Sequence, residues 1–340
     1  MKAKAIVFEK VRRVVVRDVP LPAPTASDIV VENEVSAVSG GTERWALIGK
    51  RPEIRFPNVP GYMGCGHVVW VGAAAARRGY RKGDRVYFNA SRVAGPYTGK
   101  SWMASHLSVA VVDVCHGVDW QPEGFNAHRC EPMPPGLDPL DASLCGLAGV
   151  AQRGIEMAGV PAASKVLVAG LGVIGQYAAQ ICRLKGAQVA VCDIVQSRLD
   201  IAARLGADWV IHSRRDGLAE RARQIAPDGF DIIIDTSSVP EVVNALFPLL
   251  KMWGKFVLQG WYPPPSPLDL NAAHMRLPTI YVPCGHTGRA VATALRWAAA
   301  GQLNTRDLIT HIVKPEDAPD IYRMIARGSE DFLGVVFDWR

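Results

Sequence analysis

Residues 165–180 read KVLVAGLGVIGQYAAQ, and this stretch decides the fold of the chain. An apolar run typical of a strand comes first, three glycines follow, and a helix-forming run begins directly after them. In such a unit the first glycine permits a tight turn, the second lets the backbone approach a pyrophosphate, and the third lets helix and strand pack closely. The helix N-terminus offers N–H donors to an anion. The stretch predicts a dinucleotide site at Gly170, Gly172, Val173, Ile174 and Gly175.

The next expected strand ends at Asp193, 18 residues after Gly175. A carboxylate at this point can accept both hydroxyls of a ribose, and it would repel a 2′-phosphate. The sequence therefore favours NAD over NADP as the cofactor. Arg198, five residues further on, either reaches the same ribose or caps the following helix. It is the one basic residue that follows Asp193 closely, which leaves little to hold a 2′-phosphate.

The pattern of expected strands and helices divides the chain into three parts. Strands and helices alternate over residues 143–285, which predicts an α/β fold with a doubly wound parallel Rossmann sheet. Residues 1–142 show short alternating runs bounded by turn residues, which indicates an antiparallel β domain. A segment dense in Gly and Pro, residues 119–139, lies near the boundary. The alternation stops after residue 285, so we expect residues 286–340 to return to the first domain.

Composition and charge narrow the class of protein. The chain has 49% hydrophobic and 21% charged residues, as an ordinary soluble globule does. No apolar run is long enough to span a membrane and the N-terminus has no apolar signal region, so we expect a cytoplasmic protein. The net charge of +6 is scattered, which argues against nucleic acid as a partner and favours a small-molecule substrate. The seven cysteines form no CxxC pair, which argues against disulfides and a ribbon-type zinc.

Five further segments carry a family resemblance. They are SGGTER at 39–44, PGY at 60–62, GHVVWVG at 66–72, GDRV at 83–86 and LITHIV at 308–313. With the glycine loop, they make the chain resemble the medium-chain dehydrogenase/reductase family, of the zinc alcohol dehydrogenase type, over nearly its full length. The resemblance implies a GroES-like antiparallel β catalytic domain, a Rossmann NAD-binding domain, and an active site in the cleft between them.

The zinc ligands that the resemblance implies are largely replaced. They fall on Gly40, Tyr62 and Cys145 in this chain, and one thiolate cannot form a catalytic site that needs three protein ligands. The cysteine lobe of a structural zinc is also missing, because no cysteine lies between residues 84 and 114. Cys65 and His67, at i and i+2 on an expected strand, leave open a shifted site with Cys145. We expect instead a turn whose metal ligands have been replaced.

The same turn offers groups for proton transfer without a metal. Hydride transfer to or from a carbinol carbon needs a proton acceptor or donor and a partner for the substrate oxygen. Tyr62 can supply both if a nearby cation or the nicotinamide lowers its pKa. By the resemblance, Thr42 matches a hydroxyl that relays protons, and Glu43 matches an acid that orients Tyr62 or acts as a base. The alternatives are that Tyr62 only packs, Thr42 only completes a turn and Glu43 only pairs with an arginine.

Residues near the SGGTER segment suggest the kind of substrate. Trp45 and Arg51, with Lys50 and Arg55, either line the mouth of the site and favour a flat or anionic substrate, or form a solvated turn. Cys145 is either a substrate contact or a small buried residue. The segments GTE, PGY, ITH and FDW resemble a zinc-free branch of the family that oxidises the hydroxyethyl group of a bacteriochlorophyllide. Met63 and an insert at 115–137 depart from that branch.

We therefore predict a zinc-independent oxidoreductase that transfers a hydride between NAD(H) and a secondary alcohol or ketone. A reductase of activated C=C bonds that uses NADPH is an alternative, against which Asp193 counts. A non-catalytic NAD(H)-binding sensor is a second alternative, which the loss of metal ligands also permits. The apolar stretches at 256–260 and 279–284 predict an exposed edge of the Rossmann sheet, and hence a homodimer.

Overall fold

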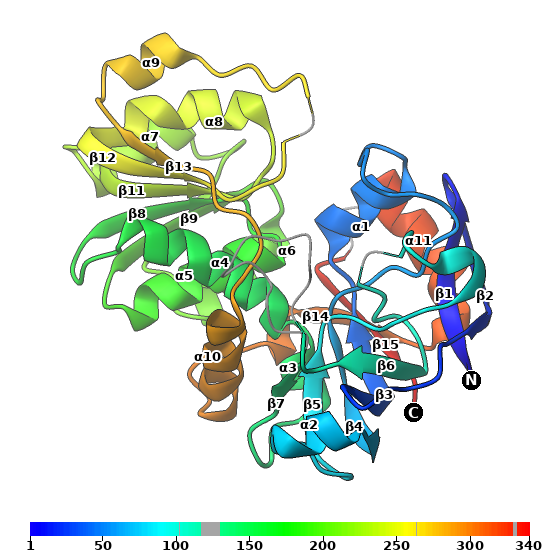
Figure 1. Cartoon of the computed structure of the whole chain (residues 1–340). Helices are drawn as coiled ribbons and strands as arrows, with labels where there is room; N and C mark the ends of the chain where they lie inside the picture. Colours follow the sequence, from blue (N-terminus) through cyan, green and yellow to red (C-terminus); the bar gives the residue numbers. More distant parts are fainter. Residues whose placement is uncertain (102, 117–129, 263, 329–331) are drawn as a thin grey trace. The chain divides into compact units, whose positions relative to one another are not determined.

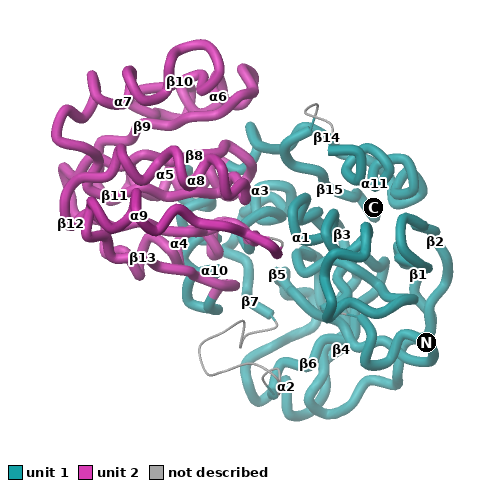
Figure 2. The backbone as a smooth tube through the Cα atoms, turned by 90° about the horizontal axis from the view of Figure 1, so that it is seen from above, with its two compact units in different colours: residues 1–146, 287–301, 305–340 teal, residues 147–286, 302–304 magenta. Residues whose placement is uncertain are grey.

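Two β-sheets organise the chain, a six-stranded parallel sheet and a seven-stranded mostly antiparallel sheet (Figure 1). The computed structural model describes residues 1–101, 103–116, 130–262, 264–328 and 332–340. Within these ranges the chain forms two compact units, coloured separately in Figure 2. The first contains residues 1–146, 287–301 and 305–340, and the second contains residues 147–286 and 302–304. Residues 117–129, which include residues 119–129 of the predicted breaker segment 119–139, lie outside the described residues.

The second unit contains the parallel sheet, as predicted. Its strands follow the order β10-β9-β8-β11-β12-β13, with helices on both faces (Figure 1). Valine, leucine and isoleucine dominate β8 and β11 and are almost fully buried, as expected for strands that are covered on both faces. The strands are β8 (Lys165–Ala169), β9 (Gln188–Asp193), β10 (Trp209–His212), β11 (Phe230–Asp235), β12 (Leu250–Leu258) and β13 (Thr279–Tyr281).

The strand order reverses between β8 and β11, and a ligand binds at such a switch point, beyond the carboxyl ends of the strands. The glycine turn after β8 lies at this point. The helices are α4 (Cys145–Ala158), which begins just before the unit boundary, α5 (Val173–Leu184), α6 (Gln196–Arg204), α7 (Leu218–Ile225), α8 (Pro240–Leu246) and α9 (Leu270–His274). A short 3-10 turn, Phe247–Leu249, follows α8.

The first unit contains the second sheet, in the order β14-β15-β3-β4-β5-β7, with β6 paired to β3. Its pairs are antiparallel except β14 with β15. The last strands of the chain thus join a sheet that is otherwise built from the first part. The strands are β3 (Asp28–Ala37), β4 (Gly64–Val71), β5 (Arg85–Phe88), β6 (Val109–Asp113), β7 (Cys130–Pro132), β14 (Ile309–Val313) and β15 (Gly334–Asp338).

A separate two-stranded sheet, β1 (Lys2–Lys10) with β2 (Arg13–Pro20), completes the β structure of this unit. One core cluster joins Ile6 and Phe8 of β1 to residues near both ends of the chain. The helices are α1 (Gly40–Leu47), α2 (Ala73–Arg77), α3 (Pro139–Ser143), α10 (Gly288–Ala299) and α11 (Ala318–Arg327), with 3-10 turns at Gly95–Tyr97, Arg306–Leu308 and Pro315–Asp317. No helix among the described residues has the length and apolar character that a membrane crossing needs.

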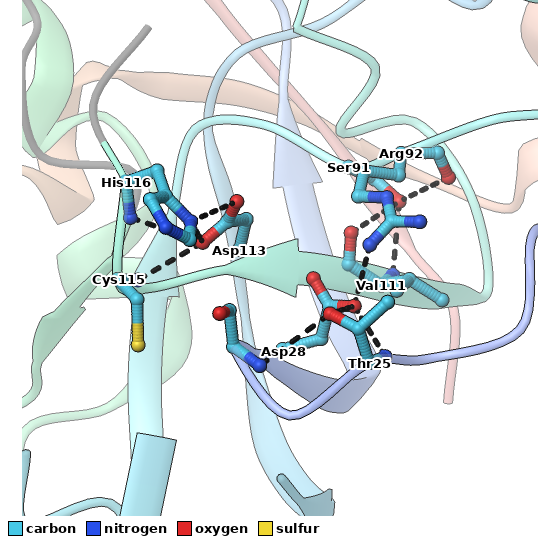
Figure 3. Close-up of polar contacts among 9 residues, drawn as sticks. Thr25, Asp28, Ser91, Arg92, Val111, Asp113, Cys115 and His116 are labelled. Atoms are coloured by element: carbon cyan, nitrogen blue, oxygen red, sulfur yellow. Dashed lines mark hydrogen bonds and ion pairs between the residues drawn. The ribbon is translucent and has the colours of Figure 1, made fainter. Parts of the chain in front are cut away.

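Polar side chains fix the point where β3 begins beside the end of β6 (Figure 3). The carboxylate of Asp28 is fully buried and accepts hydrogen bonds from Thr25 and from the guanidinium of Arg92, which lies 2.6 Å away. Across the pair, Asp113 accepts the backbone N–H groups of Cys115 and His116 at 3.0 and 3.1 Å. These bonds close the turns at the sheet end, so we assign this cluster a structural role.

Candidate functional site

The turn between β8 and α5 has the geometry that its three glycines suggest. Gly170 has φ +85°, a conformation that side-chain-bearing residues rarely adopt. A Cβ on Gly175 would lie 1.9 Å from the carbonyl oxygen of Gly170, so only glycine lets α5 pack this closely on the turn. A Cβ on Gly172 would meet no atom within 4 Å, which leaves open space over the backbone there. The turn fits a dinucleotide pyrophosphate at the N-terminus of α5.

Asp193 ends β9 and ties it to this turn. Its carboxylate accepts N–H bonds from Leu171 at 2.5 Å, Ile194 at 2.7 Å and Val195 at 2.9 Å. A carboxylate has about four lone-pair sites, so acceptor capacity is left for a ribose hydroxyl. Arg198 lies in α6, and its carbonyl oxygen accepts a bond from Gln176 of α5 at 2.8 Å.

Sequence reasoning missed two basic residues near Asp193. The parallel pairing of β9 with β10 places His212 beside Asp193, and the exposed Arg214 and Arg215 follow directly. Arg215 contacts the side chain of Gln196, at the start of α6, at 3.5 Å. Strands adjacent in a sheet bring together residues that are distant in sequence, and no local motif signals this pair.

Tyr62 is buried in the turn before β4, next to the start of α1. Gly61 has φ +92°, and a Cβ there would lie 2.7 Å from the side chains of His106 and Ser105, so the turn requires glycine. The phenol donates to the hydroxyl of Ser39 at 2.5 Å, and Thr42 also hydrogen-bonds to it. The structure therefore brings two predicted residues together and adds Ser39, which sequence reasoning missed.

The pKa of Tyr62 is shifted in the direction opposite to the one we expected. Burial raises it above the ordinary tyrosine value, and the charge of Glu43 adds to the rise. The hydrogen bonds with Ser39 and Thr42 and the charge of Arg51 oppose the rise but do not cancel it. We expected that a nearby cation or the bound nicotinamide could lower this pKa; the charge of Arg51 acts in that direction, but the larger effect of burial, which the expectation omitted, outweighs it. Tyr62 is thus a neutral phenol at neutral pH.

Glu43 lies inside the first unit, with 3% of its surface exposed. Its carboxylate accepts the backbone N–H of Ser39 at 2.8 Å and the phenol of Tyr322 from α11, and it lies 3.1 Å from Nε2 of His106. Glu43 therefore reaches Tyr62 through Ser39, and its ion-pair partner within the described residues is His106.

The other ring nitrogen of His106 extends this network. Nδ1 lies 2.7 Å from the hydroxyl of Ser36, and the indole N–H of Trp339 donates to the same hydroxyl at 2.8 Å. Because a carboxylate only accepts, the hydrogen on Nε2 is directed to Glu43, while the hydroxyl of Ser36, which accepts from Trp339, contacts Nδ1. His106 therefore links Glu43 to Ser36 and Trp339.

The residues at the implied zinc positions do not fit a catalytic zinc. Gly40 has no ligand atom, and Tyr62 is bonded to Ser39. The Cys145 thiol is buried, contacts the carbonyl oxygen of Asp141 at 3.6 Å, and has its pKa raised to about 12 by burial. Nowhere in the described ranges do three His, Cys, Asp or Glu side chains lie so that they could hold a metal ion.

The alternative zinc site, built on Cys65, His67 and Cys145, does not fit a metal ion either. Burial raises the pKa of the Cys65 thiol, which is fully enclosed. The side chain of His67, two residues further along β4, is 42% exposed and lies 3.0 Å from Glu32. Among the described residues, Cys65, His67 and Cys145 do not form a group that could hold a metal ion.

The predicted substrate residues have different surroundings. Trp45 lies under the guanidinium of Arg44, 5.4 Å from it. Arg51 pairs with Glu53 at 2.6 Å, and its charge acts on Tyr62. Cys145 has no exposed surface, so it matches the alternative of a small buried residue rather than a substrate contact.

Comparisons with known proteins agree with this fold. Residues 173–300 match the model of the zinc-binding dehydrogenase family. The chain is similar to the 2-desacetyl-2-hydroxyethyl bacteriochlorophyllide A dehydrogenase of Cereibacter sphaeroides, with 26% identity over 353 aligned residues. The alignment covers 100% of this chain and 99% of that relative.

Two solved structures cover 99% of this chain and 99% of their own, each with a TM-score of 0.83. One, from Sinorhizobium meliloti 1021, is described as a zinc-binding dehydrogenase bound to NADP and is 22% identical. The other, from E. coli CFT073, is named a short chain alcohol dehydrogenase, is complexed with NADH and is 20% identical. Residues 173–300 thus match the zinc-binding dehydrogenase family, and over nearly its whole length the chain is similar to dehydrogenases of this type.

Proposed function

We propose that this chain is a nicotinamide-dependent oxidoreductase that interconverts a secondary alcohol and its ketone without a catalytic zinc. The observation that carries the proposal is the phenol of Tyr62, which stands at an implied ligand position and is hydrogen-bonded to the hydroxyls of Ser39 and Thr42. A phenol with two hydroxyl partners can donate a proton and then hold the resulting charge.

In this proposal, the nicotinamide, when bound, supplies or accepts the hydride at the carbinol carbon. Tyr62 donates its proton to the ketone oxygen as the hydride arrives, because burial keeps the phenol neutral at neutral pH. Thr42 relays a proton from solvent to the phenolate, taking up one proton as it gives one up, and the reverse sequence oxidises the alcohol. Glu43 does not exchange protons with the substrate; it holds the backbone of Ser39.

The substrate class rests on two supports. The guanidinium of Arg44 lies 5.4 Å from the ring of Trp45, which supplies a flat aromatic side chain near Thr42, and Arg51 adds a positive charge that acts on Tyr62. The similar protein of Cereibacter sphaeroides is named for a substrate with a hydroxyethyl group on a bacteriochlorophyllide. We propose a flat, anionic secondary alcohol or ketone as the substrate.

The experiment that tests this function combines metal analysis with turnover. Untagged protein purified without chelator should contain far less zinc than one equivalent per chain, and it should oxidise secondary alcohols with NAD. Stoichiometric zinc would overturn the zinc-independent proposal. Tight NADH binding without turnover of any alcohol or ketone in a broad panel would favour a sensor instead.

We further propose that the cofactor is NAD, because the carboxylate of Asp193 remains able to accept ribose hydroxyls. Asp193→Asn removes the charge and keeps one acceptor oxygen for the backbone. Its affinity for NADH should fall about tenfold, since a hydrogen bond to a charged group is lost. Its affinity for NADPH should rise, because Arg214 and Arg215 lie in the turn that follows the adjacent strand β10.

Fluorescence titration with NADH and NADPH measures both affinities. Asp208→Asn is the matched control, because Asp208 accepts the N–H of Val189 at the opposite end of β9. A wild-type protein that binds NADPH more tightly than NADH would contradict the assignment.

We also propose a homodimer formed along β13, the edge strand of the parallel sheet. An exposed edge strand offers unpaired backbone groups to a second copy. Val282, which follows β13, is 67% exposed, and Trp253 of the neighbouring β12 is 72% exposed.

Val282→Asp should therefore shift the protein from dimer to monomer in light scattering at micromolar concentration. Val210→Asp is the control, since Val210 is 38% exposed on β10, the opposite edge of the same sheet. Equal masses for wild type and Val282→Asp would rule out this edge.

A further inference from the structure

The hydroxyl of Ser39 serves Tyr62 rather than the helix that it precedes. Ser39 is the N-cap residue of α1, and serine at this position usually accepts an N–H from the first turn. Here its side chain makes no capping bond and accepts the phenol of Tyr62 at 2.5 Å. The first turn of α1 thus gives up a stabilising cap, which is worth about 1 kcal/mol in other helices.

The backbone N–H of Ser39 is bound by a different residue from the one that its side chain contacts. Glu43, in the first turn of α1, reaches back and accepts the backbone N–H of Ser39 at 2.8 Å. The carboxylate is itself fixed by Tyr322 and His106, and both of these are fully buried. The backbone N–H of Ser39 is therefore satisfied by Glu43, while the side chain of Ser39 contacts the phenol.

We infer that Ser39 is a positioning residue that stabilises the phenolate of Tyr62 after proton donation. In that step the O–H bond of Tyr62 breaks, an O–H bond forms on the substrate oxygen, and the hydride from the cofactor completes the alcohol. The hydroxyl of Ser39 then rotates, and its own proton becomes the donor to the phenolate oxygen. This role rests on the proposed function, in which Tyr62 exchanges the proton.

Two further observations support the assignment. The hydrogen bonds of Ser39 and Thr42 both lower the pKa of Tyr62, against the larger rise caused by burial. Ser39 and Tyr62 are 4% and 7% exposed, so little water is available to replace the hydroxyl. A buried phenolate without a donor would be strongly destabilised.

The first test measures the pKa of the Tyr62 phenol and requires no turnover of substrate. In protein labelled with 3-fluorotyrosine, the ¹⁹F NMR signal that disappears in Tyr62→Phe reports this residue, and fluorination makes the phenol acidic enough to titrate while the protein stays folded. Ser39→Ala should raise the pKa of this phenol by about one to two pH units. Ser39→Thr, which restores a hydroxyl, should return it to near the wild-type value.

Ser143→Ala is the control, because Ser143 is also a buried serine but donates to the carbonyl oxygen of Leu140 within α3. It should leave the titration of Tyr62 unchanged. An unchanged titration in Ser39→Ala would overturn the inference, and so would an equal shift in Ser143→Ala.

The second test is kinetic. Ser39→Ala should lower kcat for ketone reduction about tenfold or more with little change in KM, and Ser39→Thr should recover most of the loss. A fall in kcat that Ser39→Thr does not recover would contradict the role of the hydroxyl. If the ¹⁹F titration shifts as expected and no ketone is reduced even by wild type, the coupling of Ser39 to Tyr62 stands and the proposed function fails.

Discussion

Tyr62→Phe is expected to lower kcat for ketone reduction by about two to four orders of magnitude, the range that a positioned acid or base contributes. The change removes one oxygen atom and keeps the ring that fills the turn. The KM for the ketone should change little, because the lost proton transfer acts in the transition state. Steady-state kinetics with NADH and a ketone that wild type reduces give both constants.

The protonation state of Tyr62 determines how the rates of reduction and oxidation change with pH. Burial raises the pKa of Tyr62 above 10.0, so the phenol holds its proton through neutral pH. The wild-type rate of reduction should stay flat there and fall only as the phenol ionises in strong alkali. Oxidation of the alcohol needs the phenolate and should rise over the same alkaline range. Tyr62→Phe should show neither the alkaline fall in the reduction rate nor the alkaline rise in the oxidation rate.

Tyr80→Phe is the matched control for Tyr62→Phe. Tyr80 is also a largely buried tyrosine of the first unit, but it donates to the carbonyl oxygen of Cys130 at 3.3 Å. Its replacement should leave the rate within about a factor of two or three, as an effect of less than about 0.7 kcal/mol does. A Tyr62→Phe variant as active as wild type would remove Tyr62 from the reaction.

Glu43→Ala is expected to destabilise the protein by about 3–5 kcal/mol, as the loss of one partner from a buried charged network does. The carboxylate satisfies the N–H of Ser39, the phenol of Tyr322 and Nε2–H of His106. Alanine leaves all three donors buried without an acceptor. Unfolding in urea, followed by fluorescence, measures the change in the free energy of unfolding.

Glu316→Ala is the control for Glu43→Ala. Glu316 pairs with Lys4 at 2.7 Å, and both side chains are more than half exposed. An exposed pair contributes about 0–1 kcal/mol, so this variant should unfold close to wild type. Equal stability of the two variants would mean that the Glu43 network contributes no more than an exposed pair.

The parallel sheet could be predicted because its signals are local. The glycine turn, the strand before it and the acidic residue at the end of the next strand lie within 29 residues, 165–193. Each is set by backbone conformation or by alternation along one element. The antiparallel sheet followed from its alternating runs for the same reason.

The surroundings of Tyr62 could be predicted only in part. Thr42 and Tyr62 came from a family resemblance in short motifs. Tyr322 lies 279 positions from Glu43, and no pattern in one sequence indicates that these two side chains meet. The direction of the Tyr62 pKa also depends on burial, which a sequence does not state for a residue in a turn.

The pairing of β3 with β15 sets the order in which this site can be completed during synthesis. Residues 35–37 of β3, just before Ser39, pair with residues 336–338, which are synthesised after every strand of the parallel sheet. Until residues 336–338 are made, this edge of β3 lacks its partner strand, and until Tyr322 is made, Glu43 lacks the phenol that it accepts. The nascent first unit is therefore a species that needs protection from pairing with other chains, while the parallel sheet of residues 165–281 is assembled from segments already made.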